Sequence, residues 1–173
     1  MTSKHSYTHA EKNAIKKVIA ERRDVRHFIN TPIDANIFHT ILSSAHKAPS
    51  VGLMQPWRFI HVRDIALRKK IHGIVEQERQ LTAEALGEQK NAFLSLKVEG
   101  ILQCAEVVIA ALPDKREQHI FGRRTLPEMD LASLSCAIQN MWLTARAEGI
   151  GMGWVSLFDP NAIKKIFNMP DDS

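Results

Sequence analysis

An arginine-rich segment near the start of the chain has the residue types of an anion site. It reads Arg22-Arg23-Asp24-Val25-Arg26. Arg22 and Arg26 share a face if the segment stays helical. Two guanidinium groups on one face suit a phosphate dianion, which accepts paired charge-assisted hydrogen bonds. The neighbouring cations favour the ionised form of Asp24. The alternative is a solvated helix end whose ion pairs each contribute under about 1 kcal/mol.

A proline-bounded loop offers a second set of polar groups. It runs Ala48-Pro49-Ser50-Val51-Gly52-Leu53-Met54-Gln55-Pro56-Trp57. Two prolines and a glycine predict a tight loop that leads into a strand. Ser50, Gln55 and the loop backbone would then face a ligand. The alternative is an ordinary connection between a helix and a strand.

A glycine-rich segment late in the chain is the third candidate. It reads Gly149-Ile150-Gly151-Met152-Gly153-Trp154-Val155-Ser156. These glycines follow a predicted helix and enter a predicted strand, which is the reverse of the dinucleotide-binding fingerprint. The pattern favours close approach of the backbone to a flat ligand, with Ser156 directed into the site. Gly149 is expected only to cap the helix before it.

The sequence contains no metal-binding motif, and we expect no metal. His5 and His9 have the spacing of neighbours on a helix, but they stand on a polar terminus without a nearby acidic ligand. The motifs of zinc proteases, serine hydrolases and P-loop proteins are absent from the sequence.

The hydrophobic pattern predicts the elements that position these segments. Three strands are expected, over about 57–62, 107–112 and 151–157. Helices are expected over about 8–21, 34–47, 64–75, 80–100 and 131–148, and from 159 onward. This order predicts a single α/β domain over residues 1–173. Three strands make a thin sheet for so many helices, so we expect a further C-terminal strand to be missing from this chain or supplied by a partner subunit.

Composition limits the classes of function. The 173 residues carry 45% hydrophobic side chains and a net charge of +4, typical of a globular domain without a basic nucleic-acid arm. Neither an apolar run long enough to span a membrane nor a secretory signal is visible, so we expect no membrane or nucleic-acid partner and a cytoplasmic location. Cys104 and Cys136 are expected to be buried free thiols rather than a disulfide.

Taken in order, the three segments resemble the nitroreductase-like flavoprotein superfamily over about residues 15–171. Two departures narrow the resemblance: Asp24 stands where most nitroreductases have serine, and Leu53 where they often have asparagine. Together with Gly122-Arg123-Arg124-Thr125-Leu126-Pro127-Glu128 and Gly153-Trp154-Val155-Ser156, they make a set similar to the 5,6-dimethylbenzimidazole synthases. The resemblance implies an α/β (α+β) fold with a central mixed sheet flanked by helices.

The resemblance also implies an unusual reaction, in which reduced FMN is a substrate. With dioxygen it is fragmented to 5,6-dimethylbenzimidazole, the lower ligand of vitamin B12, and erythrose 4-phosphate. A homodimer and a separate flavin reductase are implied as partners. Two alternatives stay open: an NAD(P)H-dependent FMN nitroreductase or quinone reductase, and a non-catalytic flavin-binding module.

The family pattern assigns roles to individual positions. Asp24 and Ser156 match the positions needed for fragmentation, and the stretch over about 80–102 is expected to form a lid. The FMN contacts implied are Arg22, Arg23, Asp24, Val25, Arg26, Ser50, Leu96, Gly153, Ser156 and Leu157.

Overall fold

The computed structural model describes residues 6–173. Its main core lies between helix α2 (Ala35–Ala45) and helix α5 (Met129–Ala147). Asp34 caps α2 by accepting hydrogen bonds from the first free backbone N–H groups of the helix. The apolar faces of the two helices enclose Trp57, whose side chain is 2% exposed. This core therefore fixes the loop that ends at Trp57.

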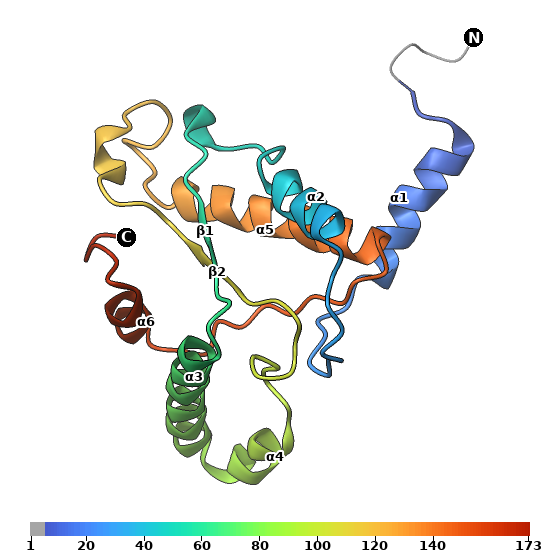
Figure 1. Cartoon of the computed structure of the whole chain (residues 1–173). Helices are drawn as coiled ribbons and strands as arrows, with labels where there is room; N and C mark the ends of the chain where they lie inside the picture. Colours follow the sequence, from blue (N-terminus) through green and yellow to red (C-terminus); the bar gives the residue numbers. More distant parts are fainter. Residues whose placement is uncertain (1–5) are drawn as a thin grey trace.

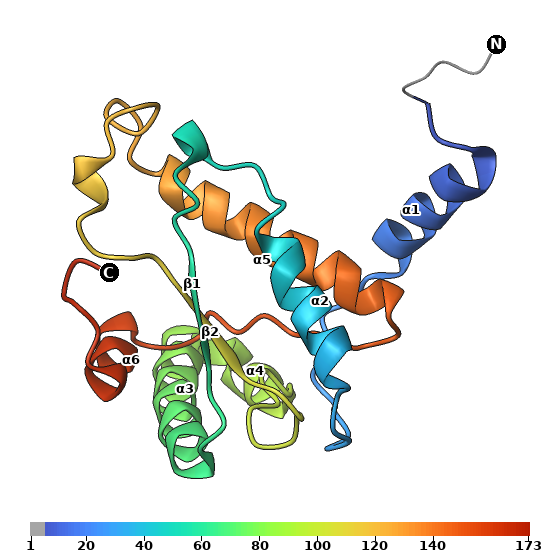
Figure 2. The same cartoon turned by 45° about the horizontal axis from the view of Figure 1, so that its top comes forward.

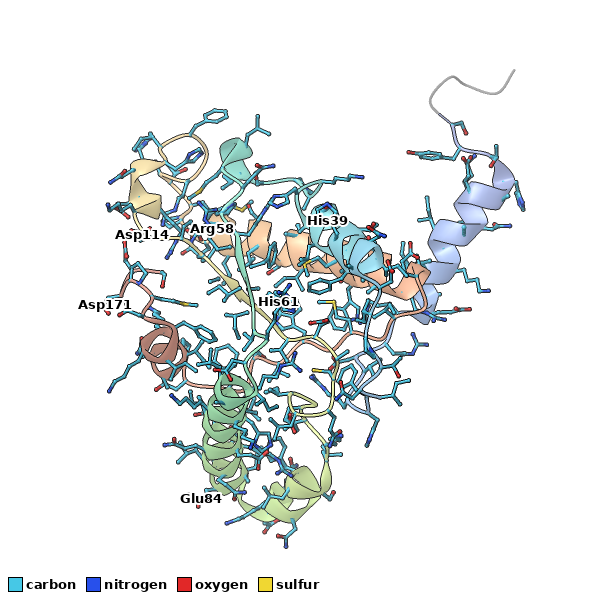
Figure 3. The ribbon with its side chains drawn as sticks, viewed as in Figure 1. His39, Arg58, His61, Glu84, Asp114 and Asp171 are labelled. Atoms are coloured by element: carbon cyan, nitrogen blue, oxygen red, sulfur yellow. The ribbon has the colours of Figure 1, made fainter. Side chains whose placement is uncertain are left out.

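A short sheet crosses between this helix pair and helix α3 (Ile65–Ala85), as Figure 1 shows. Strand β1 (Arg58–His61) pairs with strand β2 (Val108–Ala111) in antiparallel register, with Arg58 opposite Ala111. Figure 3 places His61 near the centre of the molecule. Its ring pairs with Glu106 at 2.5 Å and lies 4.8 Å from the ring of Phe38 on α2.

A second core lies on the other side of the sheet. It contains Val62, Ile71, Val75, Ile101 and Ile163. These residues join α3 to helix α6 (Pro160–Phe167), and the two helices lie side by side in Figure 2. The α3 helix runs through a short 3-10 turn (Gly87–Gln89) into helix α4 (Lys90–Ser95).

Helix α1 (His9–Glu21) stands apart from both cores. Thr8 and Glu11 form the capping box that the sequence predicts. None of its residues is buried, and Ile15 and Ile19 are at least half exposed. Within residues 6–173 this helix packs only loosely, against α5.

The α+β class is confirmed, but the sheet is smaller than expected. Within residues 6–173 two strands form it, and the third predicted strand, 151–157, is extended chain. This segment makes one parallel bridge, between Met152 and Asp24. A strand needs a continuous row of backbone partners, and here the pairing continues for one position only. The remaining predicted helices and strands agree with the structure within a few residues, with two exceptions. Helix α3 continues to Ala85, and only Lys90–Ser95 of the predicted helix 80–100 forms a separate α-helix.

The structure tests the predictions for the two cysteines and for membrane-spanning segments. Cys104 and Cys136 are both free, as expected, but neither is fully buried: Cys104 is half-buried, and Cys136 is exposed on α5. Burial raises the pKa of the Cys104 thiol. None of the helices in residues 6–173 is long and apolar enough to cross a bilayer.

Candidate functional site

The arginine-rich segment and the glycine-rich segment meet in the folded chain. We call residues 24–26 together with 152–154 the clasp. The backbone N–H of Val25 donates to the carbonyl of Met152 at 3.1 Å. The N–H of Trp154 donates to Asp24 Oδ1 at 3.0 Å, and Arg26 Nη2 donates to the Trp154 carbonyl at 2.8 Å. Two of the three predicted segments therefore form one site.

Asp24 and Arg26 form an ion pair at the centre of the clasp. Arg26 Nη2 donates to Asp24 Oδ2, and the Asp24 side chain is still 42% exposed. The carboxylate is thus held in place through both oxygens while one side remains open to solvent. A group held in this way can take up or release a proton at a ligand that docks beside it.

Gly153 is required at its position because the two segments approach closely. A Cβ atom there would lie 2.4 Å from the carbonyl oxygen of Val25, far inside van der Waals contact. It would also crowd Asp24 and Arg26. The sequence analysis predicted that glycine here lets the backbone approach a flat ligand, and that remains a prediction. In the structure, the group that approaches Gly153 is the chain's own backbone.

Arg22 and Arg23 are held at the start of the clasp by α5. The Arg22 guanidinium lies 4.4 Å from the centre of the Trp142 ring, a cation–π contact. Trp142 Nε1 donates to the Arg23 carbonyl at 3.3 Å. Arg23 is exposed and uses Nη1 on the backbone carbonyls of Ala20 and Arg22, so most of its guanidinium donors face solvent.

Ser156 and Leu157 follow the clasp on the same extended segment. Val155 packs into the second core, and Ser156, the next residue, is exposed. Because successive side chains of an extended chain point to opposite sides, the Ser156 side chain points away from that core. Leu157 is half-buried. The serine is two positions beyond Trp154, on the same side of the segment.

Ser50 and the clasp are attached at different points along α5. Its Oγ accepts a hydrogen bond from Gln55 N at 3.0 Å, and the next residue, Val51, donates its N–H to Ser133 Oγ near the start of α5. The clasp is attached at Trp142, nine residues further along the same helix. With a rise of about 1.5 Å per residue, the two attachment points are about 13 Å apart. Ser50 is therefore held apart from the clasp within the described chain, and its predicted FMN contact stays a prediction.

The predicted lid comprises the end of α3, the 3-10 turn, α4 and the irregular chain that follows, and Figure 3 shows Glu84 near its tip. We call residues 80–102 the lid segment. Leu96 is 58% exposed at the end of α4. The lid segment touches the arginine-rich region at Gly100, where a Cβ would lie 2.4 Å from the Phe28 ring and 3.1 Å from the Arg26 carbonyl.

A buried aspartate that the sequence did not reveal lies near the start of α5. Asp130 is 5% exposed, and its Oδ2 accepts from Arg116 Nε and Arg123 Nε, each at 2.9 Å. Burial raises the pKa of Asp130, but hydrogen bonds from Arg123, the Leu131 backbone and Arg116 outweigh it and hold the pKa below its usual value. Arg123, part of the quoted family motif, is therefore engaged inside the fold.

Comparisons with known proteins place the chain in a family. A model of the nitroreductase family matches residues 19–173. A 5,6-dimethylbenzimidazole synthase of Rhodobacter capsulatus is 36% identical over 96% of this chain and 82% of its own length. Another, of Rhodospirillum rubrum, is 39% identical over 86% of this chain and 72% of its own length.

A solved structure shows the same fold. An oxidized iodotyrosine deiodinase bound to FMN and 3-iodo-L-tyrosine superposes with a TM-score of 0.75, covering 91% of this chain and 83% of that one, at 20% identity. The match between this fold, the family model and the two synthases leads to one assignment. The chain belongs to the nitroreductase family and, within it, to the 5,6-dimethylbenzimidazole synthases.

Proposed function

We propose that this protein is an oxidoreductase that binds reduced FMN and, with dioxygen, fragments it to 5,6-dimethylbenzimidazole and erythrose 4-phosphate. The observation that carries the proposal is the clasp. It holds the distinguishing residue of the sequence, Asp24, by an arginine and a backbone N–H in a partly open site. Two named synthases at 36% and 39% identity support the same reaction.

The clasp and the two arginines that precede it fit a flavin mononucleotide in charge and in exposure. Arg22, Arg23 and Arg26 lie within one short segment and offer guanidinium donors to a phosphate or to the polar edge of a ring. Arg23 is the exposed one of these three arginines, whereas Arg22 and Arg26 are half-buried, so we assign it to the phosphate. Exposed Trp154 offers an aromatic surface beside them.

Reduced FMN would supply the electrons for the reaction with dioxygen, and the protein would supply positioning and proton transfer. Asp24 would accept or return a proton at the ribityl chain, because its carboxylate is fixed but only partly covered. Ser156 would donate its hydroxyl proton to a polar atom of the ligand, since it is exposed on the same segment. Val25, Gly153 and Leu157 would shape the backbone wall against which the ligand packs.

We propose that the working unit is a homodimer. Ser50 and the clasp are attached at separate points along α5, so a second copy is a direct way to bring Ser50 to the clasp of its partner. The unburied α1 helix, with Ile15 and Ile19 exposed, offers apolar surface for such a contact. A separate flavin reductase would deliver reduced FMN.

The decisive experiment is a single-turnover assay. The purified protein is loaded with photoreduced FMN under argon, oxygen is admitted, and the products are analysed by mass spectrometry. The proposal predicts 5,6-dimethylbenzimidazole with loss of flavin. Reoxidised FMN and hydrogen peroxide alone would contradict it. Sustained NAD(P)H consumption with a nitroaromatic would instead support the nitroreductase alternative, and flavin binding without any turnover would support a binding module.

A further inference from the structure

We propose that His72, Glu76 and Glu99 form a binding site for one divalent transition-metal ion, with Zn²⁺ as the best match, and that the ion fastens the lid segment to α3. One ligand atom from each of the three residues lies within 4.8 Å of the others. His72 and Glu76 come from α3, and Glu99 comes from the lid segment. The inference does not depend on the proposed reaction.

The geometry of the pair His72–Glu99 suits a shared ion better than a direct contact. Nε2 of His72 lies 3.6 Å from Oε1 of Glu99, too far for a good hydrogen bond. An ion about 2.0–2.1 Å from both atoms would see them at an angle of about 120°, close to tetrahedral or trigonal coordination. Glu76 is one helical turn from His72 on the same face, so a small side-chain rotation brings it to the same ion.

Both carboxylates are already oriented by other donors. Glu99 Oε2 accepts from the Ile101 backbone N–H at 2.5 Å. Glu76 Oε2 accepts from Arg79 Nη1 at 3.0 Å. Each interaction occupies one oxygen and leaves Oε1 for a metal, the outer-shell arrangement that fixes carboxylate ligands in metalloproteins.

The charge and the donor types select the kind of ion. One imidazole and two carboxylates carry two negative charges when the imidazole is neutral, which matches a divalent cation. Arg79 offsets part of this charge, so we expect moderate rather than very tight affinity. A mixed nitrogen and oxygen set suits Zn²⁺ and its neighbours, whereas Mg²⁺ prefers oxygen ligands and retained waters. Water would complete the coordination.

The consequence of binding would be a fastened lid segment. Arg79 already donates from Nη2 to the carbonyls of Leu94 and Leu96. A metal ion adds a link from α3 to Glu99, next to Gly100, which touches Phe28 and the Arg26 carbonyl. Both ends of the exposed α4 region would then be held to the protein, and its local opening would become less frequent.

The test is zinc binding by isothermal titration calorimetry to the chelator-treated full chain. We expect one Zn²⁺ per chain, with affinity at least about tenfold weaker in H72Q and in E99Q. Both variants keep a side-chain acceptor, and the amide oxygen introduced by E99Q can still accept from the Ile101 N–H. The control is H9Q, which removes a histidine from the exposed terminus and should leave the site unchanged.

Limited trypsin digestion provides the second readout. Zn²⁺ should slow cleavage after Lys90 and Lys97 in the wild type and in H9Q but not in H72Q, while Mg²⁺ should have no effect. Zinc affinity that is the same in H72Q and the wild type, or the absence of a stoichiometric site, would overturn the proposal. Neither readout uses flavin, so failure here is distinct from failure of the proposed reaction.

Discussion

Two aspartate–arginine clusters in this protein differ in their access to solvent and in the number of arginines that each aspartate contacts. At the start of α5, the Asp130 side chain is 6% exposed and is shared by two arginines. In the clasp, the Asp24 side chain is 42% exposed and pairs with one arginine. The same residue types therefore occur once as a closed network and once as an open pair.

The difference separates a structural role from a functional one. Asp130 has its charge balanced inside the fold, and its partners Arg116 and Arg123 have little surface left for a ligand. Asp24 is also oriented, but it keeps an open side. Removing Asp130 should therefore change the free energy of unfolding, whereas removing Asp24 should change the reaction.

The largest effect is expected for Asp130→Asn. The substitution leaves Arg116 and Arg123 half-buried without a compensating charge, a loss of about 3–5 kcal/mol for a broken buried pair. Urea unfolding followed by circular dichroism measures this change. The control is Glu117→Gln, an exposed residue on the same loop, expected within about 0.5 kcal/mol of the wild type. Equal unfolding midpoints for both variants would remove the structural role of Asp130.

Asp24→Asn should change the reaction and leave the free energy of unfolding nearly unchanged. The asparagine can keep the hydrogen bond from the Trp154 N–H, so the stability and the FMN affinity should change little. Formation of 5,6-dimethylbenzimidazole should fall at least about 100-fold, because the proton-transferring carboxylate is lost. Product yield in the single-turnover assay measures the effect. Full activity in this variant would exclude Asp24 from the chemistry.

Arg26→Ala should weaken FMN binding about 10- to 100-fold, the range for losing hydrogen bonds from a charged donor. It also removes the partner of Asp24 and the contact with the Trp154 carbonyl. Quenching of flavin fluorescence gives the dissociation constant. Lys69→Ala, an exposed charge change on α3, serves as the control. An unchanged dissociation constant in Arg26→Ala would mean that the ligand binds elsewhere.

The smallest effect is a pH dependence of stability. The pKa of Asp130 in the folded chain lies below its ordinary value of 3.8. Its stabilising contribution is therefore complete above pH 3.8 and is lost as pH falls through the lower folded value. The difference between the urea midpoints of the wild type and Asp130→Asn should be constant above about pH 5 and should narrow as the pH falls below 3.8. A difference that does not narrow on acidification below pH 3.8 would contradict the assignment.

The sequence predicted most of the helices and strands, because helix caps and short apolar runs are signals carried by neighbouring residues. Thr8 and Asp34 cap helices as expected, and the apolar run 107–112 contains β2. The third predicted strand, 151–157, failed because strand pairing depends on partners far along the chain. The segment is extended, as its residue types suggest, but its backbone pairing is limited to one bridge, between Met152 and Asp24.

The site was only partly accessible from the sequence for the same reason. The order of the motifs predicted that Asp24 and Gly153 belong to one flavin site, and in the fold these two residues are in contact. The separation of Ser50 from the clasp depends on where each segment meets α5, which no local pattern records. A local pattern also does not record that Glu99 approaches His72, because this contact requires the chain to turn back through α4.

The clasp also has a consequence for synthesis on the ribosome. Arg26 and Trp154 are separated by 128 positions, so the arginine-rich segment leaves the ribosome long before its backbone partner exists. At about 5–20 residues per second, this interval lasts roughly 6 to 26 seconds. During that time Asp24 lacks the N–H that orients it. A nascent chain therefore cannot present the assembled clasp to a flavin until the final part of this sequence has emerged.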